Sequence, residues 1–446
     1  MKKFAFVFQA ALIISLLICF VPGGKLYSQS DNYNSYEPPI QIISVLHIDP
    51  EPMNRRLTEF HLTRENYNAA KGNILFMLDL ARKYNFKMDA LFNGWYMQSV
   101  LKYNDYNHIR DLIHEGHSIG THAHPVIYNE ERDMWEVIRT QEMNYDTVKR
   151  IWDDGARFVN QVLEKIGCTT ENKVHCNPGS GAIMDRLMEE MGFLYPTGGT
   201  GDIGIEYFGN PLWNPMRLAL ERKEGYELLE DLTGKYVFVP YIPQIGNPQA
   251  HGLDLRIPQI KRHIIHLVTE WNHRESTRAE DRIWVWGAVV HPNYGTAYDD
   301  DIEEYYRWLC ENFVNKKTPK GNTIAVFSKV SEVVKRYEEW EKTHPGVSSF
   351  SYIKGEPYPY TYETFINRLK DAEYKNTLNI QGVMGFKLMR GNRAMYLMWS
   401  QQGEKELDFS KELLGNIRVI DAGGNETLQP SRAIHLSEEP IIIEQN

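Results

Sequence analysis

Short apolar segments alternate with helix-like segments over most of this chain. Seven segments have the pattern of buried β-strands, at residues 42–46, 88–92, 118–121, 174–176, 237–241, 283–290 and 323–327. Apolar positions at helical spacing predict helices at residues 66–84, 106–114, 135–166, 184–191, 257–272 and 330–340. Strands that alternate with helices form a parallel sheet covered by helices. Six or more such units favour an α/β fold of the distorted (β/α) barrel type, with chemistry at the carboxyl ends of the strands.

The pattern changes after residue 344. Residues 345–361 are rich in Ser, Gly, Pro and Tyr, which is typical of a linker. Further on, alternating runs at residues 394–399, 417–420 and 441–443 are separated by turn signals, which predicts an antiparallel sheet. We therefore expect a barrel over residues 31–344, a linker over 345–361 and a small C-terminal β domain over 362–446. Packing and solubility are the expected roles of that domain, and carbohydrate binding, for which no specific signal is present, is the alternative.

The first thirty residues have the pattern of a secretory signal peptide. Lys2 and Lys3 precede an apolar run at residues 10–21, Pro22 breaks it, and small residues follow at 28–30. A membrane anchor is the alternative, but the run is shorter than the ~20 residues that a span needs. We expect an exported protein, periplasmic or secreted, without a membrane span.

Composition narrows the possible partners. The 446 residues are 42% hydrophobic and 12% aromatic, enough to bury a sizeable core. The net charge of −10, without a Lys/Arg run, argues against a nucleic-acid partner but not against a small anionic substrate. Cys168 and Cys176 either pair in an oxidising compartment or remain free thiols.

Histidines gather at the end of the third predicted strand. The segment Gly116–Pro125 reads GHSIGTHAHP, and its His122 and His124 would point to one side of an extended chain. Neutral imidazoles that point to one side are suited to bind a divalent metal ion of intermediate softness. Zinc is the metal that such ligands favour. Ordinary loop histidines are the alternative.

The first predicted strand ends in His47, Asp49 and Glu51, which alternate and so would share one face. Asp49 is suited to complete a His/His/Asp metal site with His122 and His124. His47 and Glu51 are then candidates for moving protons. A solvent-exposed strand end with ordinary charges is the alternative.

His291 ends the late predicted strand, at the same edge of the sheet. An imidazole there suits general acid or base catalysis, because its pKa ordinarily lies near neutral pH. A packing histidine is the alternative. Asn177 opens a turn, NPGSG, at the same edge.

These motifs resemble those of the polysaccharide deacetylase (NodB-homology) family. GHSIGTHAHP is similar to the family's metal-binding motif, the segment 88–95 to its second strand, and 187–193 to a helix followed by Gly-Phe. Asn177 falls at the family's Arg-x-Pro turn, and His291 where its last-strand histidine acts. The resemblance spans about residues 42–327. It implies a seven-stranded distorted barrel, a divalent metal and a carbohydrate substrate, with Trp95 and Asn177 as substrate-binding residues.

The chain also departs from that family. Its deacetylases end the first strand with two adjacent aspartates, whereas this chain has Asp49-Pro50-Glu51. Its two metal histidines stand four apart, whereas His122 and His124 are two apart. Asn177 replaces the arginine that steadies the base. His47-Ile48-Asp49 instead resembles the His-x-Asp of zinc α-mannosidases. The metal site is thus expected to persist without the usual deacetylation machinery.

Three functions follow from this resemblance. The leading expectation is a dehydratase that eliminates water from the terminal uronate of oligosaccharides, because the chain resembles atypical members of algal (ulvan) polysaccharide utilisation systems. The alternative is a metal-dependent carbohydrate deacetylase. A non-catalytic carbohydrate-binding protein is the second alternative. The sequence names no protein partner.

Overall fold

The computed structural model describes residues 38–48, 58–139, 144–176, 182–199, 214–217, 231–241, 244–245, 257–272, 282–291, 299–318, 321–347, 368–369 and 371–445. The predicted signal peptide and most of the predicted linker lie outside these ranges, as do Asp49, Glu51 and Asn177. In the ranges described, no helix is both long and apolar enough to cross a bilayer.

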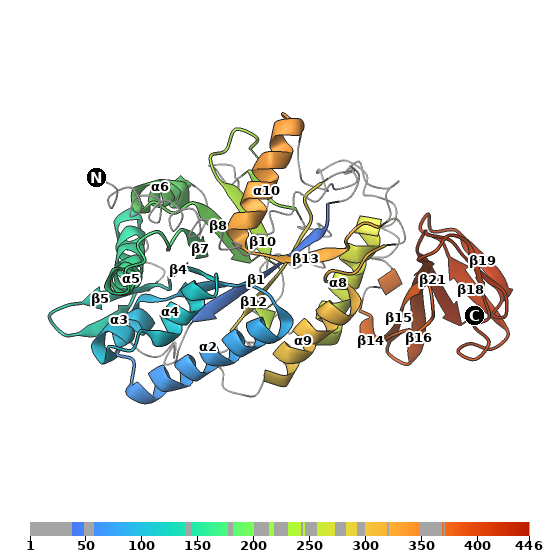
Figure 1. The fold of residues 1–446 in the computed structure, drawn as a ribbon, viewed down its shortest axis with the longest axis horizontal. Helices are drawn as coiled ribbons and strands as arrows, with labels where there is room; N and C mark the ends of the chain where they lie inside the picture. Colours follow the sequence, from blue (N-terminus) through green and yellow to red (C-terminus); the bar gives the residue numbers. More distant parts are fainter. Residues whose placement is uncertain are drawn as a thin grey trace, which may run out of the picture.

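In the described residues, a ten-stranded, mostly parallel sheet forms the larger part (Figure 1). Its order is β11-β12-β1-β3-β4-β7-β8-β10-β9, and β13 also pairs with β1. Among the strand pairs of this sheet in the described residues, only β9 runs antiparallel to its neighbour. The strands are β1 (Ile40–Ile48), β3 (Asp89–Phe92), β4 (Ser118–His122), β7 (Val174–Cys176), β8 (Tyr195–Gly199), β9 (Met216–Arg217), β10 (Val237–Tyr241), β11 (Gln244–Ile245), β12 (Val285–Val290) and β13 (Ala325–Ser328).

The sheet curls until β10 approaches β12. A Cβ added at Gly287, on β12, would lie 2.6 Å from the Cβ of Tyr241, on β10. Inward side chains of both strands join those of β1 in one apolar cluster, which includes Ile43, Val239 and Val289. The curled sheet confirms the predicted α/β class.

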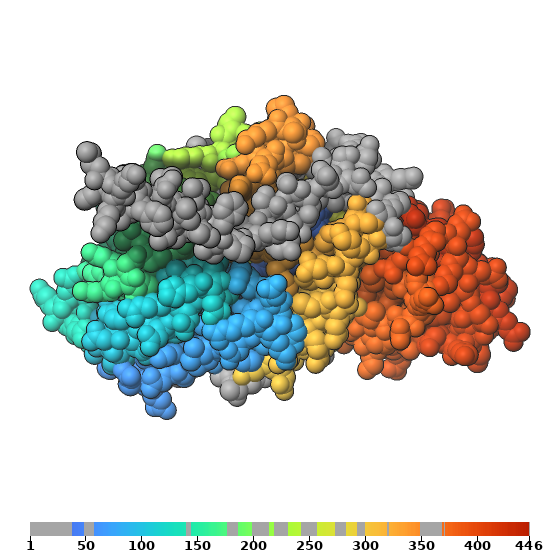
Figure 2. All heavy atoms as spheres, in the orientation of Figure 1, coloured from blue at the N-terminus to red at the C-terminus, as the bar shows by residue number. Residues whose placement is uncertain are grey.

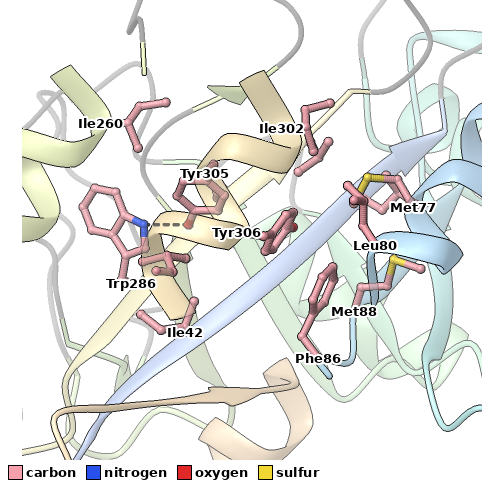
Figure 3. Close-up of a cluster of buried hydrophobic side chains, with 14 of the residues drawn as sticks. Ile42, Met77, Leu80, Phe86, Met88, Ile260, Trp286, Ile302, Tyr305 and Tyr306 are labelled. Carbon is pink, nitrogen blue, oxygen red and sulfur yellow. Dashed lines mark hydrogen bonds between the residues drawn. The ribbon is translucent and has the colours of Figure 1, made fainter. Parts of the chain in front are cut away.

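Helices cover the outer face of the sheet (Figure 1). They are α2 (Arg64–Tyr84), α3 (Gly94–Tyr103), α4 (Asn107–His114), α5 (Tyr145–Lys165), α6 (Ala182–Met191), α8 (Ile257–Asn272), α9 (Asp299–Asn312) and α10 (Val330–Thr343). Figure 3 shows part of their contact with the sheet, where the Trp286 Nε1 donates to the Tyr305 hydroxyl at 3.0 Å. Tyr306 stacks on Phe86 with 4.2 Å between ring centroids. The Tyr305 hydroxyl thus holds β12 from outside, and the Tyr306 hydroxyl holds β1 through a hydrogen bond with the Ser44 hydroxyl.

The predicted helix over 135–166 is wrong in its first part. Residues there form β6 (Met134–Val137), which pairs with β5 (Val126–Asn129) and with β2 (Glu59–Phe60) in a three-stranded sheet. Trp135 opposes Phe60 in this sheet and is 1% exposed. The helix α5 begins only at Tyr145, because the Asn144 side chain caps it by accepting from the Thr147 amide. A long-range strand pairing has overridden the local pattern.

The C-terminal part is an antiparallel sheet, as predicted. Its order is β14-β15-β16-β21-β18-β19, with β17 and β20 paired beside it. Figure 2 shows it at one end of the molecule, against α9. Phe386 of this sheet lies 5.9 Å from Phe313, between ring centroids. The strands are β14 (Glu373–Thr377), β15 (Val383–Arg390), β16 (Arg393–Ser400), β17 (Lys405–Leu407), β18 (Asn416–Ile420), β19 (Glu426–Pro430), β20 (Ile434–Leu436) and β21 (Ile441–Gln445).

One buried core joins the two parts. Residues of α8, α9, β15 and β16 belong to a single apolar cluster. At the junction the Lys261 Nζ pairs with Glu304 Oε1 at 2.6 Å and lies 4.8 Å from the Tyr374 ring centroid. The C-terminal sheet therefore shares its core with the barrel-like part. Elsewhere, Cys168 and Cys310 are free thiols.

Candidate functional site

Strand alternation brings polar side chains to the carboxyl ends of the parallel strands. On β1, β4, β10 and β12, inward positions recur every second residue, and those in the middle of the strands are apolar or glycine. The next inward position in each case is polar. These terminal residues are His47 on β1, His122 on β4, Tyr241 on β10 and His291 directly after β12.

Four histidines at this end of the sheet are packed ring against ring, and among them His122 meets His124 edge-on, at 4.6 Å between centroids and 81° between planes. His47 and His122 are stacked, with 3.9 Å between centroids and 20° between planes. His291 meets His47 edge-on, at 5.0 Å and 89°. His47, His122 and His291 are 4%, 8% and 6% exposed, so protein replaces most of the water around them. We call His47, His122, His124 and His291 the histidine cluster.

The side chains of His122 and His124 approach each other with their Nε2 atoms. Strand β4 ends at His122, and His124 lies beyond it, yet their Nε2 atoms are 3.0 Å apart. Two imidazoles on one tetrahedral zinc have their nitrogens about 3.4 Å apart, since each Zn–N bond is about 2.1 Å. The two nitrogens are therefore at hydrogen-bond distance here, and a separation larger by about 0.4 Å would let both bind one zinc ion.

A third ligand is not found in the described part of the chain. Within it, no group of three or more His, Cys, Asp or Glu side chains is arranged to hold a metal ion. Asp49, the predicted third ligand, lies outside the described residues. It follows directly after β1, whose last residue Ile48 is described and buried.

Trp95 lies behind His124. The centroid of its ring is 5.8 Å from that of the His124 ring. On other sides the Trp95 ring packs edge-on against Phe60 and Trp135, with 5.5 Å and 5.9 Å between centroids. With 1% exposure it supports the imidazole from inside the protein. Its predicted contact with substrate stays a prediction.

Asn93 holds the end of β1 and was missed by sequence reasoning. Its Nδ2 donates to the Ile48 carbonyl at 2.5 Å, and its Oδ1 accepts from the Tyr96 amide at 3.1 Å. It thus caps α3 and fixes the backbone immediately before Asp49. An Asn between a strand and a helix is a sequence signal for a helix cap. The hydrogen bond to the Ile48 carbonyl could not be predicted from that signal.

His117 is separate from the histidine cluster. It precedes β4, and its Nδ1 accepts a hydrogen bond from the Met88 amide at 3.1 Å. Burial lowers the pKa of its imidazole to about 4. It is therefore a neutral structural acceptor at the opposite end of the strand from His122.

Tyr241 was also missed. Its hydroxyl lies 3.5 Å from His47 Nε2, and the two rings meet edge-on at 6.0 Å and 80°. The segment 237–241 was predicted as a strand, so a signal was present. Counting every second residue from Val237 through Val239 leads to Tyr241 as the inward residue at its carboxyl end.

Comparisons with known proteins give similarity of fold only. No protein-family model matches the chain, and no curated protein matches it. A putative polysaccharide deacetylase from Mycobacterium smegmatis aligns at a TM-score of 0.42 and 13% identity, over 73% of this chain and 96% of that one. A probable polysaccharide deacetylase from Pseudomonas aeruginosa PAO1 aligns at 0.42 and 14%, over 69% and 93%. A 4-alpha-glucanotransferase from Thermococcus litoralis aligns at 0.42 and 13%, over 67% and 40%. These similarities are weak, and the named reactions differ.

Proposed function

We propose that this chain is a metal-dependent enzyme that acts on carbohydrate through acid–base catalysis at the histidine cluster. The supporting observation is that imidazoles from β1, from the end of β4 and from the end of β12 meet at one end of the curled sheet. The sugar substrate rests on the sequence resemblance to polysaccharide deacetylases.

His122 and His124 would hold the metal, with Asp49 as the expected third ligand. Their facing Nε2 atoms, 3.0 Å apart, are the basis for this assignment. A divalent ion bound there would polarise an oxygen of the sugar substrate. Zinc is our first candidate, because imidazole ligands suit it.

Dehydration of a uronate is the first candidate reaction. Besides the metal pair, the cluster contains two further imidazoles, His47 and His291, and Glu51 is a third predicted proton carrier. One group would take the proton from the carbon beside the carboxylate, and a second would protonate the hydroxyl on the next carbon. The C–O bond then breaks, a C=C bond forms, and water leaves. Each proton transfer is expected to raise the reaction rate by about 10²–10⁴-fold.

Deacetylation is the second candidate reaction. The observation that supports it is the position of His291 next to His47, which stacks on His122 of the metal pair. An imidazole in that place suits protonation of the sugar oxygen as water attacks the acetyl carbon and the ester C–O bond breaks. Asp49 and Glu51 would then replace the usual paired aspartates, with Asp49 as the metal ligand and Glu51 as the base that takes the proton of the attacking water.

One experiment separates these reactions. The zinc-loaded full chain is incubated with saturated uronate oligosaccharides and with acetylated oligosaccharides, and product masses, ultraviolet absorbance and free acetate are followed. Loss of one water with new absorbance supports dehydration, and released acetate supports deacetylation. Sugar binding that is undiminished in zinc-free protein, without turnover of either substrate, would instead support the non-catalytic alternative.

A further inference from the structure

The small sheet β2-β6-β5 receives both chain segments that carry the candidate metal ligands. His124 is followed by Pro125 and then by β5, and the segment with Asp49 and Glu51 leads along the chain from β1 to β2. Strand β6 lies between β2 and β5 in this sheet. The two ligand-bearing segments are therefore joined through a strand that belongs to neither of them.

Two consecutive amides at the end of β6 hold these segments. The Val137 amide donates to the Thr58 carbonyl at 2.9 Å, and the Ile138 amide donates to the Pro125 carbonyl at 2.8 Å. Thr58 immediately precedes β2, and Pro125 immediately follows His124. Because a strand between two antiparallel neighbours bonds to one on each side, the end of β6 fixes the distance between the two segments.

The Trp135 side chain anchors β6 to the interior of the protein. Its Nε1 donates to Gln98 Oε1 at 2.8 Å, and its indole packs edge-on against Trp95, with 5.9 Å between centroids. A Cβ at Gly94 would lie 2.5 Å from the Trp135 Cη2, so the indole fills the space that this glycine leaves at the start of α3. The indole thus sets the position of β6 relative to α3.

The same indole reaches the histidine cluster through one intervening ring. Trp95 packs on Trp135 and lies 5.8 Å from His124, between ring centroids. It also packs edge-on against Phe60 of β2, which is opposite Trp135 in the small sheet. Trp135 therefore acts on the His124 segment in two ways, through the backbone of β6 and through the Trp95 ring.

We propose that Trp135 is a positioning residue of the metal site, which through β6 sets the His124 segment against the segment that carries Asp49 and Glu51. The proposal rests on the proposed function, because it names the residue that holds its metal ligands in register. The hydrogen-bond separation of the His122 and His124 nitrogens differs from a zinc-binding separation by only about 0.4 Å. A small displacement of His124 is therefore enough to change the affinity for zinc.

The test measures zinc binding by the full chain. Trp135→Leu removes the indole, and Trp135→Phe keeps a ring beside Trp95. Trp340→Leu is the matched control, because Trp340 is also buried, at 7% exposure, and lies on α10, where it stacks on His344. Calorimetric titration gives the zinc affinity, the visible spectrum of bound Co²⁺ reports its coordination, and thermal unfolding shows that each variant is folded.

We expect Trp135→Leu to weaken zinc binding about 10–100-fold, as for other groups that orient a metal ligand, and to change the Co²⁺ spectrum. Trp135→Phe should recover most of the zinc affinity. Trp340→Leu should lower the melting temperature as Trp135→Leu does, yet leave the zinc affinity within about twofold. A merely structural role of Trp135 would give the two leucine variants the same affinity for zinc.

Hydrogen exchange gives a second readout, on the unaltered chain. Coupling between two sites is reciprocal, so zinc must slow the opening of β6 by the factor by which that opening weakens zinc binding. We expect zinc to slow exchange of the Val137 and Ile138 amides more than that of the β18 amides, which report general stabilisation of the chain. This measurement and Trp135→Phe decide the matter if the leucine variant does not fold.

Two results would overturn the proposal. One is a folded Trp135→Leu variant that binds zinc as tightly as Trp340→Leu does. The other is an equal effect of zinc on exchange in β6 and in β18. Zinc bound by His122 and His124 without turnover of any sugar would refute the proposed enzyme, yet it leaves both measurements decisive for Trp135, so the two failures are distinguishable.

Discussion

The rings of His47 and His122 stack at 3.9 Å although their strands are not neighbours. Strand β3 lies between β1 and β4 in the sheet. Strands two places apart in a sheet are separated by about 9.6 Å, twice the usual spacing. The curl of the sheet turns both side chains toward its axis and closes this gap. The site therefore depends on the curvature of the sheet as much as on its residues.

Removal of either facing imidazole should abolish metal binding and activity together. We expect His122→Ala and His124→Ala each to weaken zinc binding at least about 100-fold. Loss of a residue that only hydrogen-bonds a ligand already lowers metal affinity about 10–100-fold, and loss of the ligand itself lowers it further. Zinc content by mass spectrometry and calorimetric titration measure this. His114→Ala, at an exposed position on α4, is the control. Retention of zinc by both variants would contradict the assignment of the pair.

His291 should affect turnover without affecting the metal. We expect His291→Gln to lower kcat by about 10²–10⁴-fold, the usual contribution of a proton-transferring group. Zinc content should equal that of the unaltered chain, because the pair of facing Nε2 atoms belongs to His122 and His124. Steady-state kinetics and zinc analysis on the same preparation check both parts. A variant that loses zinc would instead make His291 a ligand.

A buried carboxyl should make stability depend on pH. Asp89 is fully buried on β3, where its Oδ2 accepts from the Val330 amide at 2.9 Å, and burial raises its pKa from 3.8 to about 7. The folded chain thus binds this proton more tightly than the unfolded chain. The stability that it contributes is complete below about pH 4 and is lost as the pH rises through about 7.

Asp89→Asn isolates that contribution. Relative to the Asn variant, the free energy of unfolding of the unaltered chain should fall by up to about 4 kcal/mol between pH 4 and pH 7.5. Comparing the two chains cancels other groups, such as His108 and His117, whose lowered pKa values act in the opposite direction. Urea unfolding at several pH values measures it, with the exposed Asp79→Asn as control. Parallel pH profiles for the two chains would contradict it.

The shared core should make the two parts unfold together. Phe386 is fully buried against Phe313, across the junction. We expect Phe386→Ala to lower the free energy of unfolding by about 3–5 kcal/mol. Calorimetry should show one shifted transition. Leu428→Ala, at a side chain that is 62% exposed, should have little effect. Two separate transitions, with only one shifted, would show independent domains.

Elements with a complete local pattern were predicted well. The segments 237–241 and 257–272 match β10 and α8 residue for residue. The helices α3 and α9 were missed, because each follows a segment that was interpreted only as a strand or its exit. Strand β6 was mistaken for the start of a helix, because its pairing with β2 joins residues far apart in sequence.

The sequence by itself determined which side chains stand at the strand ends. Two-residue alternation is a local property, so His47, His122 and His291 were identifiable as neighbours at one edge of the sheet. Only the tertiary structure decided which nitrogens meet. It pairs His122 with His124, and His47 with Tyr241 from a strand far along the chain. The curl of the sheet and the space left by Gly287 set those contacts, and both depend on packing that no single segment encodes.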